Sequence, residues 1–260
     1  MLSDEADMRT IRHISQSDTS LLRSGLDSAL TLIELVVVVV VIGIVAAFLL
    51  PAISRAKHQA QRIHCVNNLH QLGIAVQNFV AANHAYPSII AGTNSDNPGS
   101  WMGQLERGGF DVSKPKTNFL ADGVWRCPSA RWGKDWPPHT IPACYGYNGF
   151  GTGGNHTNAL GLHGQFISGS ALFAPVGESE IVKPDEMMGI GDSFSGEVFF
   201  MRTEFKYRKP FPRHQSIVNV MFCDGHVESP TLKFVFEDTS DGALVRWNRD
   251  HLPHRERLTP

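Results

Sequence analysis

Residues 35–50 read LVVVVVVIGIVAAFLL, a run in which no side chain is charged or polar. Counted from Leu30, the apolar segment has 21 residues, and a helix of that length at ~1.5 Å per residue crosses a bilayer core of about 30 Å. Consecutive valines favour a strand in water, but in lipid a helix satisfies every backbone group internally. A signal-peptide core is shorter, at about 7–15 residues. The run therefore predicts one membrane-spanning helix over residues 30–50.

Past Pro51 the pattern becomes amphipathic. Apolar or small residues recur in steps of three and four, at Ile53, Ala56, Ala60, Ile63, Val66, Leu69, Leu72, Val76 and Phe79. This period predicts that the helix continues to about Ala82, with Pro51 kinking it or marking its exit from the membrane. The single apolar stripe of this second part should pack on a soluble domain.

The composition excludes several classes of protein. Hydrophobic residues make up 42% of the 260 and charged residues 18%, which excludes a largely disordered chain. The net charge of -2 gives no sign of a nucleic-acid partner. The mean hydropathy of -0.14 excludes a protein with many membrane spans.

The segment that begins at Ala29 (ALTLIELVVVVVVIGIVAAFLLP) resembles the N-terminus of type IV pilin-like proteins, the prepilins and the pseudopilins of type II secretion. The TLIEL of residues 31–35 matches the family core directly. The later pattern C-x-N-N-L-x-Q-L-G, from Cys65, is similar to a prepilin-like subfamily. With Leu30 as the first mature residue, Glu34 is the fifth and Pro51 the twenty-second, a position where the family often has a helix-kinking proline.

The resemblance implies a processing site. A prepilin peptidase would cut between Ala29 and Leu30 and methylate the new amine. The family usually has Gly where this chain has Ala29 and Phe where it has Leu30. Its leaders are usually short and basic, whereas residues 1–29 hold three arginines against five acids.

The resemblance also implies a role for Glu34 and a location. Glu34 would pair with the N-terminal amine of a neighbouring subunit, so that the chain assembles with itself and with other pilin-like subunits through the apolar helix. The protein would sit in a bacterial inner membrane as a single-pass protein, with its N-terminus in the cytoplasm and its C-terminal domain outside. The charges around the span do not decide this orientation.

The C-terminal region, residues 84–260, is rich in glycine, proline and aromatic residues, and its short apolar runs between turn residues predict strands. The expected fold class is α+β and pilin-like, with a long N-terminal helix packed on a mainly antiparallel β-sheet domain. The expected organisation is a leader over 1–29, a transmembrane helix over 30–50, an amphipathic helical stalk over 51–83 and a β-rich domain over 84–260.

The clearest hairpin follows Ile217. Alternating residues lead into Asp224-Gly225, a strong two-residue turn that would place Cys223 opposite His226 and Met221 opposite Glu228. The spacing from His214 to Asp224-Gly225 also fits the H-X9-DG pattern of the same prepilin-like subfamily.

Four cysteines would lie outside the cytoplasm, where disulfides persist. Cys127 and Cys144 flank a proline-rich loop, and a bridge between them would stabilise the fold by roughly 3 kcal/mol. Cys65, on the long helix, would stay free in this arrangement. The sequence alone leaves the connectivity open.

Twelve histidines raise the hypothesis of a metal site at the hairpin, formed by His214, Asp224 and His226. The chain has no H-E-x-x-H and no C-x-x-C motif. We therefore expect no metal and no cofactor, with Asp224 shaping its turn and His214 bonding locally.

An enzymatic alternative rests on Gly191-Asp192-Ser193, which resembles the nucleophile block of GDS-type serine esterases. No histidine has an aspartate three residues before it, so the base that would activate Ser193 is missing. We expect a structural subunit and not an enzyme. The alternative of another class is a membrane-tethered module that never polymerises and binds a glycan or an envelope partner.

Overall fold

The computed structural model describes residues 31–88, 101–110, 123–130, 144–152, 159–167, 173–193 and 213–258. The chain divides into two compact units, Met1–Ala52 and Ile53–Pro260. The predicted leader and the Ala29–Leu30 bond lie outside the described residues.

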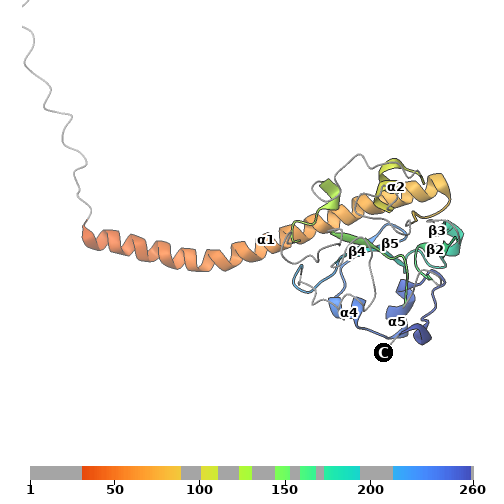
Figure 1. The fold of residues 1–260 in the computed structure, drawn as a ribbon. Coiled ribbons are helices and arrows are strands. Elements are labelled where there is room, and N and C mark those ends of the chain that lie inside the picture. Colours follow the sequence, from red (N-terminus) through yellow and green to blue (C-terminus); the bar gives the residue numbers. More distant parts are fainter. Residues whose placement is uncertain are drawn as a thin grey trace, which may run out of the picture. The chain divides into compact units, whose positions relative to one another are not determined.

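Helix α1 extends over Leu32–Asn83 and contributes to both units (Figure 1). Pro51 lies inside it, and the helix continues past this residue although proline lacks the N–H that would bond to residue 47. This confirms the prediction of a helix that continues to about residue 82. By length and composition α1 could cross a membrane, and it is the one such helix in the described part of the chain.

Among its described residues, the second unit contains two antiparallel sheets. The larger has the strand order β1-β4-β5-β6, with β1 at Tyr145–Tyr147, β4 at Met188–Asp192, β5 at Val220–Phe222 and β6 at Val227–Glu228. The smaller pairs β2 (His163–Phe166) with β3 (Phe173–Pro175). The long helix and antiparallel sheets confirm the predicted α+β, pilin-like fold class.

Short helices complete the second unit. The α-helices are α2 (Trp101–Arg107), α4 (Leu232–Phe236) and α5 (Asp241–Leu244). The 3-10 helices are η1 (Gly123–Trp125), η2 (Glu178–Glu180), η3 (Val245–Trp247) and η4 (Arg255–Arg257).

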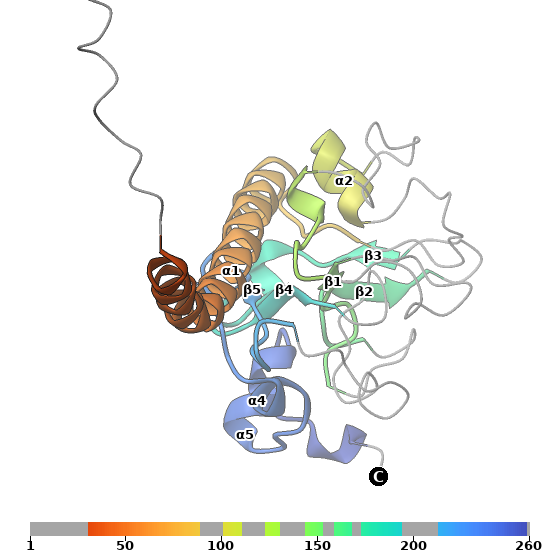
Figure 2. The same cartoon turned by 90° about the vertical axis from the view of Figure 1, so that its left-hand side faces the viewer.

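Strands β1, β4 and β5 of the larger sheet are buried, whereas β6 is partly buried. One core joins the α1 residues Leu69 and Leu72 to Met221 of β5, while Val220 and Phe222 point into a second core with Trp247. This alternation follows the two-residue period of a strand. Figures 1 and 2 show the part of α1 in this unit along one side of the sheet and α4 and α5 on the other.

The hairpin forms in a different register from the one predicted. Met221 lies opposite Val227, not Glu228, and the Phe222 N–H donates to the His226 carbonyl at 2.9 Å. The loop therefore has three residues, 223–225. Gly225 is its last residue with a φ of +94°, the positive-φ position that closes a three-residue loop. The predicted two-residue turn is wrong because only this one residue takes positive φ.

Candidate functional site

The first half of α1 presents apolar side chains around its whole circumference. From Leu32 to Leu50 every large apolar side chain is exposed, by between 49% for Val38 and 82% for Leu32. A soluble monomer rarely leaves so much contiguous apolar surface in water. This half of the helix therefore needs lipid or other protein around it.

Glu34 lies at the start of this apolar surface and closes a capping box. Its Oε2 accepts hydrogen bonds from the Thr31 N–H at 2.8 Å and the Thr31 hydroxyl at 2.9 Å. In return, the Glu34 N–H donates to Thr31 Oγ1 at 3.3 Å. The pair satisfies donors that a helix start leaves open. The T-x-x-E spacing of Thr31 and Glu34 is the sequence pattern typical of this cap.

The two ends of the H-X9-DG pattern have separate surroundings. His214 is buried, with Nε2 3.4 Å from Cys127 Sγ and Nδ1 3.4 Å from Ser129 Oγ. Asp224 instead accepts from the His226 N–H at 3.1 Å and contacts its Nδ1 at 2.5 Å. The hypothesis that all three residues form one metal site is therefore wrong for His214, whose described contacts lie elsewhere.

Gly225 brings the hairpin loop onto α1. A Cβ atom added to Gly73 of α1 would lie 2.8 Å from the Gly225 carbonyl oxygen, so the helix and the loop touch backbone to backbone. The Gln77 side chain also donates a hydrogen bond to the Cys223 carbonyl. The Asp-Gly end of the pattern thus docks the hairpin on the helix.

The disulfide joins Cys65 of α1 to Cys127, 62 residues later, with their Cα atoms 5.4 Å apart. Cys144 is buried and free, so the predicted Cys127–Cys144 bridge is wrong. The prediction considered closure of the proline-rich loop. It missed that Cys65 shares the buried side of α1 with Leu69 and Leu72, where it meets Cys127.

A buried carboxylate stands beside this disulfide. Asp192 Oδ2 lies 3.6 Å from His214 Nε2 and accepts two hydrogen bonds from Asn219, at 2.8 and 2.9 Å. Burial raises the pKa of the Asp192 carboxyl, and the nearby His214 and Arg213 oppose that rise. Burial lowers the pKa of His214, against the attraction of Asp192. Both shifts favour the neutral forms.

The surroundings of Ser193 do not support the hypothesis that it is the nucleophile of a serine esterase. Ser193 is fully buried at the end of β4, and its N–H donates to the Cys144 carbonyl at 3.0 Å. The His214 imidazole in this area lies with its Nε2 3.6 Å from Asp192 Oδ2, and both side chains are buried.

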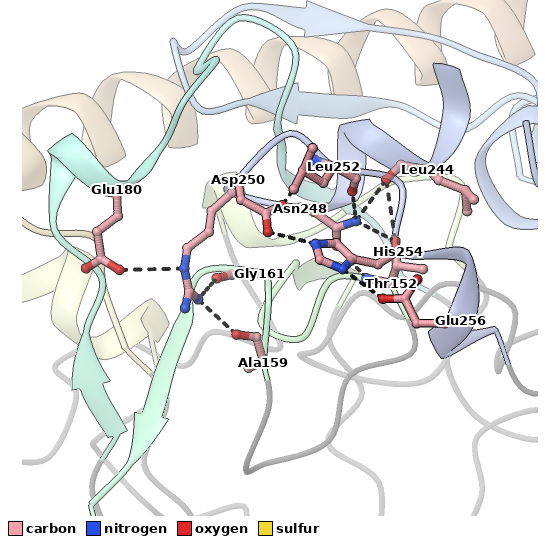
Figure 3. A network of polar contacts seen from close by, with 11 residues as sticks. Thr152, Ala159, Gly161, Glu180, Leu244, Asn248, Asp250, Leu252, His254 and Glu256 are labelled. Atoms are coloured by element: carbon pink, nitrogen blue, oxygen red, sulfur yellow. Dashed lines mark hydrogen bonds and ion pairs between the residues drawn. The ribbon is translucent and has the colours of Figure 1, made fainter. Parts of the chain in front are cut away.

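A polar network that the sequence analysis missed holds the last part of the chain (Figure 3). The Asn248 side chain donates to Thr152 Oγ1 at 2.9 Å and to the Leu252 carbonyl at 2.7 Å. Arg249 Nη1 donates to the carbonyls of Ala159 and Gly161, at 2.9 and 3.0 Å. Residues of these types are common in loops, so no sequence signal singled them out.

Several known proteins are similar to parts of this chain. A family described as "Protein of unknown function (DUF1559)" matches residues 54–110. The type II secretion system core protein G of Pseudomonas aeruginosa is 32% identical over 107 residues, which cover 37% of this chain and 75% of that protein. No solved structure matches the chain.

Two further relatives have the same name. The protein from Pectobacterium carotovorum is 29% identical over 112 residues, or 41% of this chain and 62% of its own length. The protein from Escherichia coli is 27% identical over 107 residues, or 41% of this chain and 67% of its own length. This chain thus spans about three fifths of the Pectobacterium protein.

A long apolar N-terminal helix followed by an antiparallel sheet domain defines a pilin-like protein. The chain belongs to the family of type II secretion system core protein G.

Proposed function

We propose that this protein is a membrane-anchored structural subunit of a type II secretion or type IV pilus-like system, and that it works by assembly and not by catalysis. The proposal rests on the exposed apolar surface of α1 from Leu32 to Leu50. The names of the relatives support a secretion role.

The proposal includes processing. A prepilin peptidase cuts the Ala29–Leu30 bond and methylates the new amine, which then stands four residues before Glu34. The mature chain is a single-pass protein of the bacterial inner membrane, with its N-terminus in the cytoplasm and residues 84–260 outside. Residues 30–50 cross the membrane and residues 51–83 form the stalk.

Assembly follows from the same helix. Apolar surfaces of neighbouring copies, or of other pilin-like subunits, pack together as they leave the lipid. Glu34 exchanges its contact with Thr31 for the N-terminal amine of a neighbour, because a lone charge in apolar surroundings is costly and a paired one is less so. Pro51 adjusts the course of the helix beyond the packed segment.

N-terminal sequencing of the mature protein, purified from membranes that contain the peptidase, tests the processing step. A start at Leu30 is expected. A chain that keeps the residues before Leu30 in the presence of active peptidase would contradict it, and Ala29→Arg serves as the uncut control.

Two variants separate the two roles of Glu34. Glu34→Gln keeps a capping-box residue but removes the charge, whereas Thr31→Val keeps the charge but removes the hydroxyl of the cap. We expect both to insert into membranes, and only Glu34→Gln to fail in assembly as measured by crosslinking. If Thr31→Val fails and Glu34→Gln assembles, Glu34 acts as a helix cap and not as the assembly contact.

A further inference from the structure

Three potential metal ligands from distant parts of the chain meet in the core of the second unit. Cys65 comes from α1, Cys127 from the segment after η1, and His214 from the segment before β5. One ligand atom from each lies within 4.8 Å of the others, and all three residues are buried. The disulfide uses the two sulfur atoms, and His214 Nε2 lies 3.4 Å from one of them, Cys127 Sγ.

The donor types and spacing suit zinc. Zinc binds thiolate sulfur at about 2.3 Å and imidazole nitrogen at about 2.0–2.1 Å in a tetrahedron, which places the ligand atoms of one ion about 3.5–3.8 Å apart. The 3.4 Å between Cys127 Sγ and His214 Nε2 is close to this separation. Ser129 Oγ lies beside the other ring nitrogen, Nδ1, at 3.4 Å, and such an outer contact orients a metal-bound imidazole.

Asp192 stands next to the histidine, outside the group of three residues whose ligand atoms lie within 4.8 Å of one another, and is the nearest candidate for a fourth ligand. Asp192 Oδ2 faces His214 Nε2 at 3.6 Å and is held by Asn219. Its second oxygen, Oδ1, is buried and has no hydrogen-bond partner in the described part of the chain. A buried carboxylate oxygen without a partner is unfavourable, and coordination to a cation would relieve this.

We propose that, when Cys65 and Cys127 are reduced, they bind one zinc ion together with His214 and Asp192. The disulfide and the metal site are then alternative states of one cluster. A dithiol reductant supplies two electrons and two protons to the disulfide, giving two thiols and the oxidised, cyclic disulfide of the reductant. Zinc then replaces both thiol protons, which pass to solvent.

The consequence is structural and does not depend on the proposed function. In the oxidised state the disulfide connects α1 to the 123–130 segment. In the reduced state zinc makes the same connection and also joins the segments of His214 and Asp192. The helix therefore stays attached to its own domain under reducing as well as oxidising conditions, as long as zinc is present.

Cobalt(II) is the probe that tests this proposal. The full chain in detergent is reduced with a phosphine, freed of reductant under nitrogen and titrated with Co²⁺. We expect one cobalt per chain, with the sulfur-to-cobalt charge-transfer absorption and the intense ligand-field bands of a tetrahedral site, and with displacement by one equivalent of Zn²⁺. The oxidised protein should give neither absorption. Cobalt on exposed histidines would lack the thiolate band.

Variants identify the ligands. Cys65→Ser and His214→Gln should lose or strongly alter the tetrahedral spectrum, and Asp192→Asn should weaken binding by at least about 10-fold. Cys223→Ser and His226→Gln are matched controls outside the cluster and should bind like the wild type. The result with reduced wild type does not depend on any variant folding. A reduced, folded wild type, checked by circular dichroism, that binds no cobalt through sulfur would overturn the proposal, as would unchanged spectra in both ligand variants.

Discussion

The two halves of α1 share one helical backbone but differ in what surrounds their side chains. From Leu32 to Ala52 every residue is exposed. Between Cys65 and Val80 eight residues are buried, and five of them (Cys65, Leu69, Leu72, Val76 and Val80) belong to the core of the second unit. The first half is apolar all round, whereas the second has a single buried stripe. The chain therefore covers one half of its helix with its own domain and leaves the other half for lipid or other copies.

The largest expected effect comes from removing a buried contact of the second half. Leu69→Ala should lower the free energy of unfolding of the domain by about 2–5 kcal/mol, because Leu69 is fully buried. Ile42→Ala, in the first half, should leave it unchanged, because Ile42 is exposed. Denaturant unfolding of the full chain in detergent, followed by the fluorescence of the buried tryptophans, measures both. Equal losses in the two variants would contradict the comparison.

The disulfide should have the next largest effect. Reducing Cys65–Cys127 in the presence of a chelator should lower the free energy of unfolding by about 2–4 kcal/mol, since the bridge closes a long loop between α1 and the domain. Mass spectrometry after alkylation without reduction should find only Cys144 and Cys223 modified, and only once the protein is unfolded, because both are buried. Alkylation of Cys65 in the oxidised, unfolded protein would refute the bridge.

Two glycines in α1 give a smaller, matched contrast. Gly73→Ala should destabilise the domain by about 1–3 kcal/mol, because its Cβ would meet the Gly225 carbonyl oxygen at 2.8 Å. Gly43 has no atom within 4 Å of the added Cβ, so Gly43→Ala should keep or slightly raise the helix content. The same unfolding experiment and circular dichroism compare them. A Gly73→Ala variant as stable as the wild type would show that the hairpin does not dock so closely.

The smallest effect concerns alkaline pH. Burial raises the pKa of Tyr147 well above its ordinary value, and the same cause raises the pKa of Tyr86 and Tyr145. Their phenols stay protonated in the fold but ionise in the unfolded chain above pH about 10, so stability is full below that pH and falls above it. Each phenol contributes a loss of about 1.4 kcal/mol per pH unit.

Tyr147→Phe tests this dependence. It should reduce the slope of the unfolding free energy against pH above pH about 10 by one such contribution, although it also loses the hydrogen bond to the Pro87 carbonyl. An unchanged slope would mean that Tyr147 ionises freely in the folded protein.

The sequence predicted the long elements because their patterns repeat. The apolar run and the three-to-four spacing identified α1 beyond Pro51, and Leu69, Leu72, Val76 and Phe79 of the predicted stripe are buried. The predicted stripe begins too early in the chain, because Ile53 and Ile63 are exposed. Periodicity finds a helical face, but it does not show how far along the helix the rest of the domain reaches.

The incorrect predictions from the sequence concern contacts between distant segments. Strands of two to five residues are too short for a recognisable alternation, and a bulge between Met188 and Ile190 further breaks the period of β4. The partner of Cys127 depends on the packing of α1 against a loop 62 residues away. The meeting of His214 with Cys127 and Asp192 likewise follows from tertiary packing, although His214 and Asp192 each stand in a motif noted in the sequence.

The proposed assembly requires that other copies cover the first half of α1. Ile42 and Ile74 make a matched pair for testing it, since each is 62% exposed and they lie in different halves of the helix. A photo-crosslinking amino acid is placed at one of these positions in the full chain, and the chain is irradiated in membranes that contain the processing peptidase. We predict a ladder of multiples of the chain through position 42 and no such ladder through position 74. Strictly monomeric protein, with crosslinks to lipid alone through position 42, would contradict assembly and leave a non-polymerising membrane tether.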